Sequence, residues 1–486
     1  MTGVTRPLRV GLMYLTLGLV AACGGGGGGD AGSGSVPATP TAAASGPLQL
    51  GALGWPAELT YPRHIALIAS GGDGKLSWSV ECGPGLGCAV VNGMLEMESR
   101  AEGALARVPV TATVTDGTGA RASVSTVISV WPKIMTSGLH TLAGATDRPG
   151  PQLLIITDGY PEDDAGFVLD TASAIVDSMF GHPEIAAHRS AWNIHVAHVP
   201  SPVSAEGGLA GSSRFGMNSC PTSSSLLACV QPWTVRQFAA LYLPNYTDVL
   251  VLANDSLHPD GLTKEGIAVV SRFRDTVTSA VHELGHSFAG LGDEYVLPGG
   301  RLPNVLPPPP DQPNITRATD LEHIPWKHWI EPGTPLPTQL SDPVTVGLYE
   351  GAYTMPAGYF RPTASSFMRV SAGNGQVGPV NGEAWALQVY AKGGAWRRMS
   401  PATGSPLDRL AQPADGWRFV AEPLMDRTIC ETRWYVNGVE RAEQRGAVEL
   451  RLSDAGALEV RVDLVDLTGR IRKNRGVASS LTWTVR

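Results

Sequence analysis

Apolar and polar residues follow different patterns in three successive parts of the chain. From 47 to 133 they alternate singly between turn-forming residues, as in strands with one buried face. From 136 to 395 short apolar runs alternate with segments of helical periodicity, which is typical of α/β domains. From 396 to 486 the single alternation returns. The pattern therefore predicts a multidomain protein, in which an α/β (α+β) domain lies between two β-sandwich domains.

The strongest alternation locates individual elements. The strands expected in the two sandwiches are Leu76–Val80, Val108–Val114, Ala122–Val130, Arg433–Val436, Val448–Leu452, Leu458–Leu464 and Ser480–Val485. The central domain is expected to contain strands at Leu153–Thr157, Trp192–Val199, Asp248–Ala253 and Gly266–Val270, and helices at Ala165–Phe180 and Val235–Leu243. These elements predict a mixed sheet with a site at one edge. The proline-rich segment Val305–Pro313 is expected to be a loop.

The segment Thr276–Tyr295, TVTSAVHELGHSFAGLGDEY, combines helical periodicity with candidate chemistry. Its apolar residues recur as on a helix with one buried face. His282 and His286 lie four residues apart on one face of that helix, where two neutral imidazoles can bind one zinc ion. Glu283 is offset from both histidines and is a candidate general base for a water molecule at the metal. The segment therefore predicts a zinc hydrolase.

A third ligand is expected from the residues that follow the helix. In a continuous helix Asp293 would lie roughly 10 Å along the axis from His286, too far to share its metal. Gly290 and Gly292 favour an end to the helix, so that the chain can fold back. We expect Asp293 to be the third ligand, with Glu294 as the alternative. The competing interpretation is a chance HELGH match on a core helix, with both carboxylates in solvent.

The N-terminus has the pattern of an export signal. Residues 1–22 carry two arginines, then an apolar run and small residues, as in a signal peptide. The sequence Val20-Ala21-Ala22-Cys23 resembles the bacterial lipobox, so Cys23 is expected to be lipidated. Residues 23–46, with six consecutive glycines, are expected to form a flexible tether. The alternative is an ordinary cleavage site beside an unmodified Cys23.

These features predict an exported bacterial lipoprotein at the outer membrane or cell surface. No other segment has the length and apolar character of a membrane span. In an exported protein, Cys82–Cys88 and Cys220–Cys229 are the expected disulfides, which leaves Cys430 unpaired. Loss of the two arginines in residues 1–22 takes the formal net charge from −8 to −10. Such a charge argues against nucleic acid as a partner.

Several other polar residues are candidates for a functional site. His323 and His328 lie among tryptophans and are expected to be core histidines, with metal binding as the alternative. The carboxylates of Asp158, Asp163 and Asp164 follow a strand, where a capped turn is favoured over a calcium site. Arg361 and Arg369 are expected to bind an internal carboxylate; a substrate carboxylate is the alternative.

Eight short segments occur in a characteristic order between about 150 and 390. They are DGY (Asp158–Tyr160), NIHVAHVPSP (Asn193–Pro202), DVLVLAN (Asp248–Asn254), HELGHSFAGLGDEY (His282–Tyr295), PNIT (Pro313–Thr316), PWKHWI (Pro325–Ile330), VGLYEGA (Val346–Ala352) and YFRPTASSFMR (Tyr359–Arg369). In this order they resemble the IgA-peptidase family of bacterial zinc metallo-endopeptidases. The segments ASGGDGKLSWSV and VTATVTDGTGARASVSTVISV resemble the immunoglobulin-like sandwich modules of bacterial surface proteins.

The family resemblance implies a metzincin-like zinc peptidase domain, with a methionine-containing turn below the metal. Met368 matches the position of that methionine. Metzincins generally place the third ligand six residues after the second histidine, whereas Asp293 is seven residues after His286. The implied function is a lipid-anchored zinc endopeptidase acting on proteins or peptides. Two alternatives are a surface binding or adhesion lipoprotein with a structural zinc, and a hydrolase of another substrate; Glu283 argues against the structural zinc.

Overall fold

The computed structural model describes most of the chain from residue 46 onward. The described residues are 46–51, 53–59, 62–101, 105–130, 134–136, 138–201, 204, 213–219, 228–256, 261–272, 275–297, 311–370, 375–408, 411–453 and 458–486. The expected signal peptide at 1–22, Cys23, the tether up to residue 45, Cys220 and the loop residues 305–310 lie outside this part. None of the helices in the described part combines the length and hydropathy that a membrane span requires.

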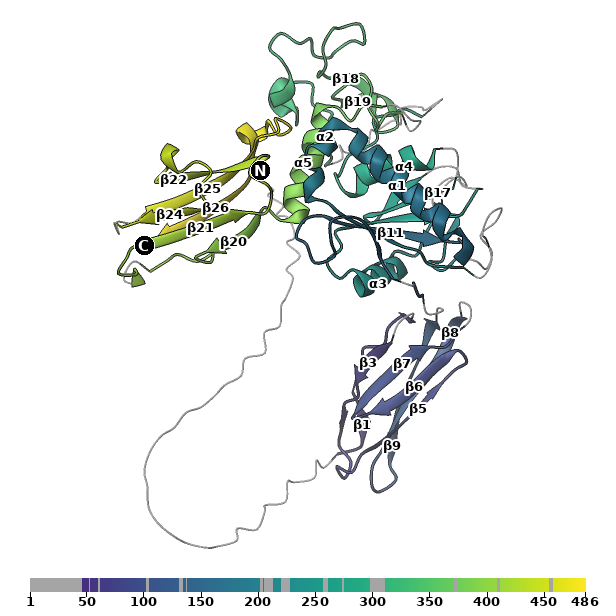
Figure 1. Ribbon diagram of the computed structural model, residues 1–486. Coiled ribbons are helices and arrows are strands. Elements are labelled where there is room, and N and C mark those ends of the chain that lie inside the picture. The colour runs from purple at the N-terminus through teal and green to yellow at the C-terminus, as the bar shows by residue number, and fades with distance from the viewer. Residues whose placement is uncertain are drawn as a thin grey trace, which may run out of the picture.

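The central part of the chain is built on a six-stranded mixed sheet (Figure 1). In spatial order its strands are β10 (His140–Ala143), β12 (Asn193–Ala197), β11 (Gln152–Asp158), β15 (Asp248–Ala253), β17 (Ile267–Ser271) and β16 (Leu262–Lys264). The four inner strands are parallel, and the edge strands β10 and β16 are antiparallel to their neighbours. The mixed sheet predicted from the sequence is therefore present.

Helices cover both faces of this sheet, which explains why its inner strands are apolar throughout. One face packs on α1 (Ala165–Gly181), α2 (Pro183–Ala186), α4 (Thr276–Ser287) and α5 (Pro379–Gly393). The opposite face packs on α3 (Pro232–Tyr242). In Figure 1, α1 and α4 lie above the sheet and α3 lies below it. This arrangement places α4, with its two histidines, directly after β17 and next to the β16 edge.

The sequence predicted α1, α3 and the four inner strands to within a few residues, but it missed α5 and both edge strands. Helix α5 buries Asn381, Gly382 and Glu383 along with apolar residues, so its sequence lacks a single apolar stripe. The edge strands have three and four residues, too few to show a clear alternation. A further hairpin, β18 (Tyr349–Ala352) and β19 (Met355–Arg361), was also not predicted.

Two small sheets form the N-terminal part, with one hydrophobic core between them. One contains β2 (Glu58–Leu59), β9 (Arg121–Val130), β8 (Leu105–Thr115) and β5 (Ser77–Cys82), and the other contains β3 (Arg63–Ala66), β7 (Met94–Ser99) and β6 (Leu86–Val91). A separate pair, β1 (Gln49–Leu50) and β4 (Ala69–Ser70), lies beside them. The expected Cys82–Cys88 disulfide is present and joins β5 of one sheet to β6 of the other.

The remaining cysteines of the described part also agree with expectation. Cys229 is disulfide-bonded, and Cys430 is free and buried. The expected partner Cys220 lies outside the described residues.

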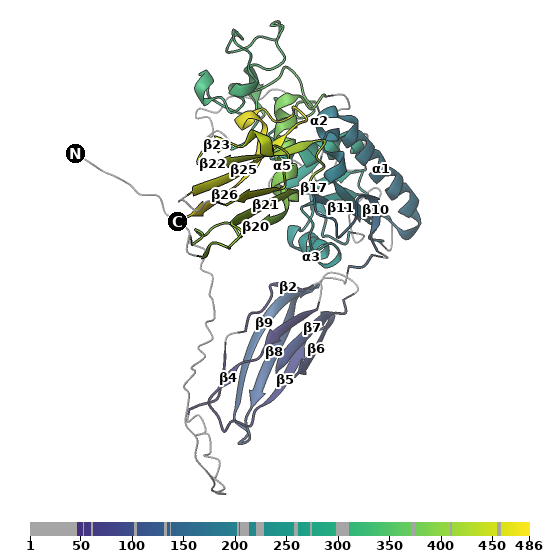
Figure 2. The same ribbon diagram turned by 60° about the vertical axis from the view of Figure 1, so that its left-hand side comes forward.

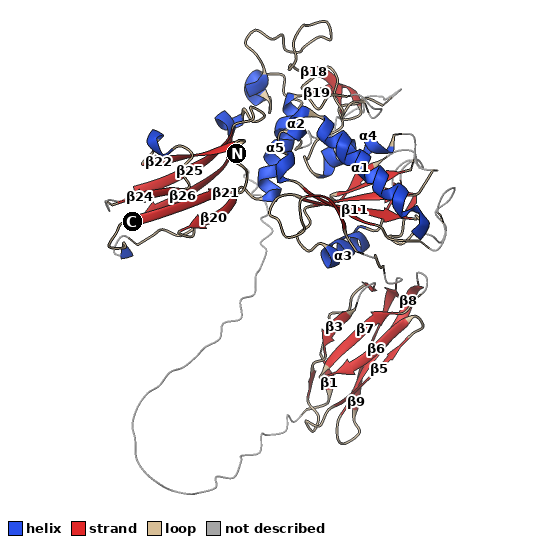
Figure 3. Ribbon diagram, viewed as in Figure 1, coloured by secondary structure: helices blue, strands red, loops and turns tan. Residues whose placement is uncertain are grey.

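Two facing sheets also form the C-terminal part (Figure 2). One contains β20 (Trp396–Ser400), β21 (Trp417–Pro423) and β24 (Glu449–Leu452), and the other β23 (Val439–Glu440), β22 (Cys430–Val436), β25 (Leu458–Asp466) and β26 (Val477–Val485). Figure 3 shows the helices concentrated in the central part, between two strand-rich parts. The fold is therefore a multidomain α+β arrangement.

The C-terminal sheets share a buried core with the central part. Met425, Cys430, Leu464 and Ile471 join the hydrophobic cluster that contains α1, α4 and α5. A buried polar contact crosses the same boundary, because His188 Nε2 lies 2.6 Å from an oxygen of Asp466 and Tyr390 of α5 donates to that oxygen over 2.9 Å. Contacts of this kind attach the C-terminal sheets firmly to α5.

An ion pair between a partly exposed lysine and a buried carboxylate joins α5 to the sheet and to α4. Lys392 Nζ lies 2.9 and 3.0 Å from the two carboxylate oxygens of Asp248 and donates to the carbonyl of Ser287 at the end of α4. The side chain of Asp248 is only 2% exposed. Burial raises the pKa of Asp248 to about 6, although the charge of Lys392 acts against this rise.

Lys392→Met should lower the free energy of unfolding by about 3–5 kcal/mol, because it leaves the buried Asp248 carboxylate without its cation. Chemical denaturation of the purified chain measures this change. Adding Asp248→Asn to the same protein should recover much of the loss, and Lys264→Met, at an exposed position of β16, should have little effect. A loss below about 1 kcal/mol, the value typical of exposed ion pairs, would contradict the prediction.

Candidate metal centre

Helix α4 presents its histidines beside the sheet edge because its apolar face is fixed in the core. Ala280, Val281 and Leu284 are buried in the cluster shared with α1. The helix ends at Ser287, and Gly290 takes the left-handed conformation with φ of 67°. The amide of Leu291 then donates to the carbonyl of Gly285 over 3.0 Å. The chain therefore folds back after the helix, as its glycines predict.

The returning chain brings Asp293 to the two histidines. His282 Nε2, His286 Nε2 and Asp293 Oδ1 lie 3.2 Å from one another. In the described part of the chain, these three residues are the one group of three or more histidine, cysteine or acidic side chains placed to hold a metal. Glu294, the alternative from the sequence, points elsewhere.

Backbone carbonyls determine which ring nitrogens carry protons. The Nδ1 of His282 lies 3.0 Å from the carbonyl of Phe367, and the Nδ1 of His286 lies 2.7 Å from that of Leu291. A carbonyl only accepts hydrogen bonds, so each Nδ1 carries a proton and donates it. In the neutral rings, both Nε2 lone pairs then face each other and the carboxylate of Asp293. A cation between these atoms removes the repulsion.

The pKa shifts within the cluster also indicate that it favours a positive charge. Burial lowers the pKa of His286, but the hydrogen bond that the ring donates to Asp293 and the charge of Glu283 outweigh it and raise the pKa to about 9. Burial also opposes ionisation of Asp293, yet the hydrogen bonds and charges of both histidines hold its pKa below the ordinary value. In the metal-free cluster a bound proton therefore supplies the positive charge that a metal ion would bring.

The spacing of the three atoms fits a small tetrahedral metal ion. Ligands at about 2.0–2.1 Å from zinc, at the corners of a tetrahedron, are about 3.3 Å apart. The observed separations of 3.2 Å are close to this value. Two imidazole nitrogens and one carboxylate oxygen are also a usual donor set for zinc with one position left for another ligand.

Glu283 lies next to the cluster, as its place in the motif predicts. Its side chain is 5% exposed, and Thr263 Oγ1 on β16 donates to Oε2 over 2.8 Å. Burial raises the pKa of Glu283, against the charges of His282 and His286. Thr263 was not identified from the sequence, because its strand carries no recognisable pattern.

Met368 packs directly under the helix between the two histidines. It is fully buried, and a Cβ at Gly285 would come within 2.7 Å of its sulfur. The same turn supplies Phe367, whose carbonyl orients His282. Met368 therefore lies below the helix that carries the two histidines.

Glu294 holds the loop that carries Asp293. It is fully buried, and its Oε1 accepts from the amides of Asn314 and Asn381 over 3.0 and 2.9 Å. Its Oε2 accepts from the hydroxyl of Ser366 over 2.8 Å. Burial raises the pKa of Glu294 in spite of these three hydrogen bonds. The Glu294 carboxylate thus connects three distant segments to the loop that carries Asp293.

Asn314 also holds the residue before Asp293. Its side chain accepts from the amide of Gly292 over 2.8 Å and donates to the carbonyl of Gly292 over 2.9 Å. Both neighbours of Asp293 are therefore fixed. The sequence placed Asn314 in a family motif without a role and did not identify Asn381, whose helix was not predicted.

Several other candidates have structural roles, whereas His323, expected in the core, is exposed beside Asp320. The Nε2 of His328 lies 2.5 Å from Glu383, and Asp158 accepts from the hydroxyl of Ser213 and the amide of Arg214. Arg361 donates to the carbonyls of Glu350, Gly351 and Ala364, and its charge also acts on the internal carboxylate of Glu294, whose pKa it lowers. Arg369 likewise donates to the carbonyl of Glu294.

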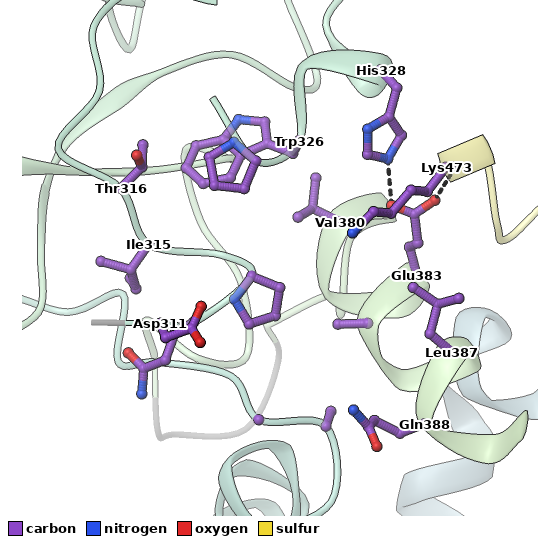
Figure 4. Close-up of a pocket in the computed structure, with 16 residues that line it drawn as sticks. Asp311, Ile315, Thr316, Trp326, His328, Val380, Glu383, Leu387, Gln388 and Lys473 are labelled. Atoms are coloured by element: carbon purple, nitrogen blue, oxygen red, sulfur yellow. Dashed lines mark hydrogen bonds and ion pairs between the residues drawn. The ribbon is translucent and has the colours of Figure 1, made fainter. Parts of the chain in front are cut away.

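A cavity of about 540 Å³ borders the loop at Gly290 (Figure 4). Ile315, Trp326 and Leu387 supply apolar walls, and Glu383 and Lys473 lie on its α5 side. None of the clustered ligand candidates lines it, and neither does Glu283. This cavity is therefore separate from the candidate metal centre.

Two histidines on one helix, a returning carboxylate and an adjacent buried glutamate define a candidate mononuclear metal centre. Residues 143–345 match the model of a family described as IgA Peptidase M64. The family resemblance seen in the sequence is thereby confirmed over this segment, which contains the whole centre and ends before Met368. The match supports a peptidase.

Other comparisons add little. No curated protein matches the chain. One similar solved structure is the titin domains z1z2 in complex with telethonin, at 13% sequence identity and a TM-score of 0.11. The match covers 23% of this chain and 55%, about half, of that one.

Asp293→Ala should lose most tightly bound divalent metal, because it removes one of three candidate ligands, whereas the exposed control Asp163→Ala should keep it.

Glu294→Gln should weaken metal binding by about 10- to 100-fold, the usual effect of removing a residue that orients a ligand. The glutamine oxygen can still accept from Asn314 and Asn381, but its N–H group then faces the Ser366 hydroxyl, which must change from donor to acceptor. Metal content after dialysis against graded chelator measures both effects. Wild-type retention by Glu294→Gln would rule out its positioning role.

Proposed function

We propose that the protein is a zinc-dependent endopeptidase that hydrolyses peptide bonds of proteins or peptides. The observation that carries the proposal is the convergence of two Nε2 lone pairs and the Asp293 carboxylate at tetrahedral spacing. His282, His286 and Asp293 would hold the zinc. A bound zinc ion would supply Lewis acidity toward a water molecule and toward the peptide carbonyl.

Glu283 is the proposed general base. It is adjacent to His282 in the chain, is buried beside the centre, and is not one of the three clustered ligand candidates. Its carboxylate accepts a proton from the attacking water and then donates it to the departing amine. A site whose metal serves structure alone is usually closed by four protein ligands, whereas three converge among the residues that the structure describes. This difference favours catalysis over the structural alternative.

We propose a metzincin-like architecture for the centre. The helix with its histidine pair, the glycine-dependent return to Asp293 and the buried Met368 below Gly285 support this assignment. The spacing of seven residues between His286 and Asp293 departs from the usual six, and the left-handed Gly290 lies within this longer connection. The carboxylate ligand in place of a third histidine is the main chemical difference.

The position of β16 supports a polypeptide substrate over a small molecule. This strand is at the edge of the sheet, and its Thr263 contacts Glu283. Backbone groups along a sheet edge can pair with an extended peptide, which would then pass the proposed base. A small ester or amide would gain nothing from such an edge.

We also propose that the protein is an exported lipoprotein, anchored at the outer membrane or cell surface through Cys23. The signal-like pattern before Cys23 supports this location, and the Cys82–Cys88 disulfide is typical of proteins in oxidising compartments. The N-terminal sheets, proposed to be an immunoglobulin-like module, would then act as a spacer between the tether and the peptidase.

Glu283→Gln should lower peptide hydrolysis by roughly two to four powers of ten, because the amide cannot accept the proton of the water. The variant should still fold and bind about one zinc per chain through its unchanged ligands. Peptide cleavage rates and metal content of the purified proteins test this prediction. Glu265→Gln, at an exposed turn of the same sheet, is the matched control and should cleave like wild type. Equal cleavage by wild type and Glu283→Gln would contradict the assigned base.

Cys23→Ser should release the protein from the membrane, because the lipidated cysteine is the proposed anchor. Membrane fractionation and metabolic labelling with a fatty-acid probe measure the loss. Cys430→Ser, which removes the buried free cysteine, should keep both the label and the membrane association. A wild-type protein that takes up no label would disprove the anchor.

A further inference from the structure

The contact between β16 and Glu283 has features of a positioning device. β16 pairs antiparallel with β17, in the register Leu262 to Val269 and Thr263 to Ala268. β17 in turn packs against α4. The hydroxyl of Thr263 lies 2.8 Å from Oε2 of Glu283 and 2.9 Å from the carbonyl oxygen of the same residue. One hydroxyl group on the edge strand therefore contacts both the backbone carbonyl and the side-chain carboxylate of Glu283.

The hydroxyl of Thr263 holds one oxygen of the carboxylate and leaves the other. In the described part of the chain, Thr263 is the one side chain that hydrogen-bonds to the Glu283 carboxylate. Threonine has a branched Cβ and few side-chain rotamers, so its hydroxyl is well placed to fix a partner. With Oε2 held, Oε1 remains to accept a proton.

Gly261 provides the space for this arrangement. A Cβ at Gly261 would lie 2.8 Å from Cγ and 2.9 Å from Oε1 of Glu283, closer than real side chains approach. Gly261 does not have a positive φ, so its role is to provide space and not an unusual backbone conformation. The glutamate thus lies against the backbone just before β16 and is hydrogen-bonded from within that strand.

We propose that Thr263 is a positioning residue for proton transfer by Glu283. Gly261, which has no side chain, leaves the space that the Glu283 carboxylate occupies. The proposal rests on the proposed peptidase function. Thr263 acts through Glu283 and touches neither the candidate ligands nor, by this argument, the reacting carbonyl. Its loss should therefore reduce turnover without weakening metal or substrate binding.

The test compares Thr263→Val and Thr263→Ser in the zinc-loaded full chain. Thr263→Val keeps the shape but removes the hydroxyl, and it should lower kcat by about 10- to 100-fold, as expected when a catalytic group is misplaced. The KM, metal content and unfolding midpoint should stay at wild-type values. Thr263→Ser should restore kcat, because it returns the hydroxyl. Crystal structures should show the Glu283 carboxylate displaced in the valine variant and in place in the serine variant.

Thr234→Val is the matched control. Thr234 is a buried threonine of α3, on the other face of the sheet, and its hydroxyl has no partner among the described residues. Its removal should leave kcat unchanged. Wild-type kcat in Thr263→Val, together with an inactive Glu283→Gln, would overturn the role of Thr263 alone. Absence of peptide cleavage by the zinc-loaded wild type would overturn the peptidase function and this proposal together.

Discussion

Two backbone carbonyls control the chemistry of the centre. Those of Phe367 and Leu291 each accept the Nδ1 proton of one histidine, so both Nε2 lone pairs point toward the carboxylate of Asp293. Electron-rich atoms 3.2 Å apart repel one another unless a cation lies between them. In the metal-free cluster a proton on His286 supplies this positive charge, and the surrounding protein holds the three side chains where a metal ion can replace it.

Contacts from distant segments hold the loop that carries Asp293 in this position. Glu294 is buried at the cost of desolvation, which its hydrogen bonds to Asn314, Asn381 and Ser366 offset in part. Each of these partners comes from a different part of the chain. The loop around Asp293 can therefore reach its final form only when α5 and the methionine turn are in place.

The C-terminal sheets take part in the same network. Glu383 of α5 accepts from the backbone amides of Arg472 and Lys473, over 2.6 and 2.7 Å. Two residues earlier in that helix, Asn381 donates to Glu294. A continuous set of contacts thus connects the C-terminal sheets to the residue beside Asp293. These sheets therefore support the centre, in addition to any role in binding a partner.

The sequence by itself determined the features that depend on local periodicity. The phase of His282, Glu283 and His286 follows from the helical repeat, and the return of the chain follows from the freedom of Gly290. It favoured Asp293 over Glu294 as the third ligand but left both open, because the direction of an irregular loop depends on Asn314 and the methionine turn. Neither Thr263 nor α5 was predicted from the sequence, because their importance arises from contacts between segments far apart in sequence. Tertiary packing decided these points because a hydrogen bond is specified by the positions of two groups, and sequence pattern describes each group alone.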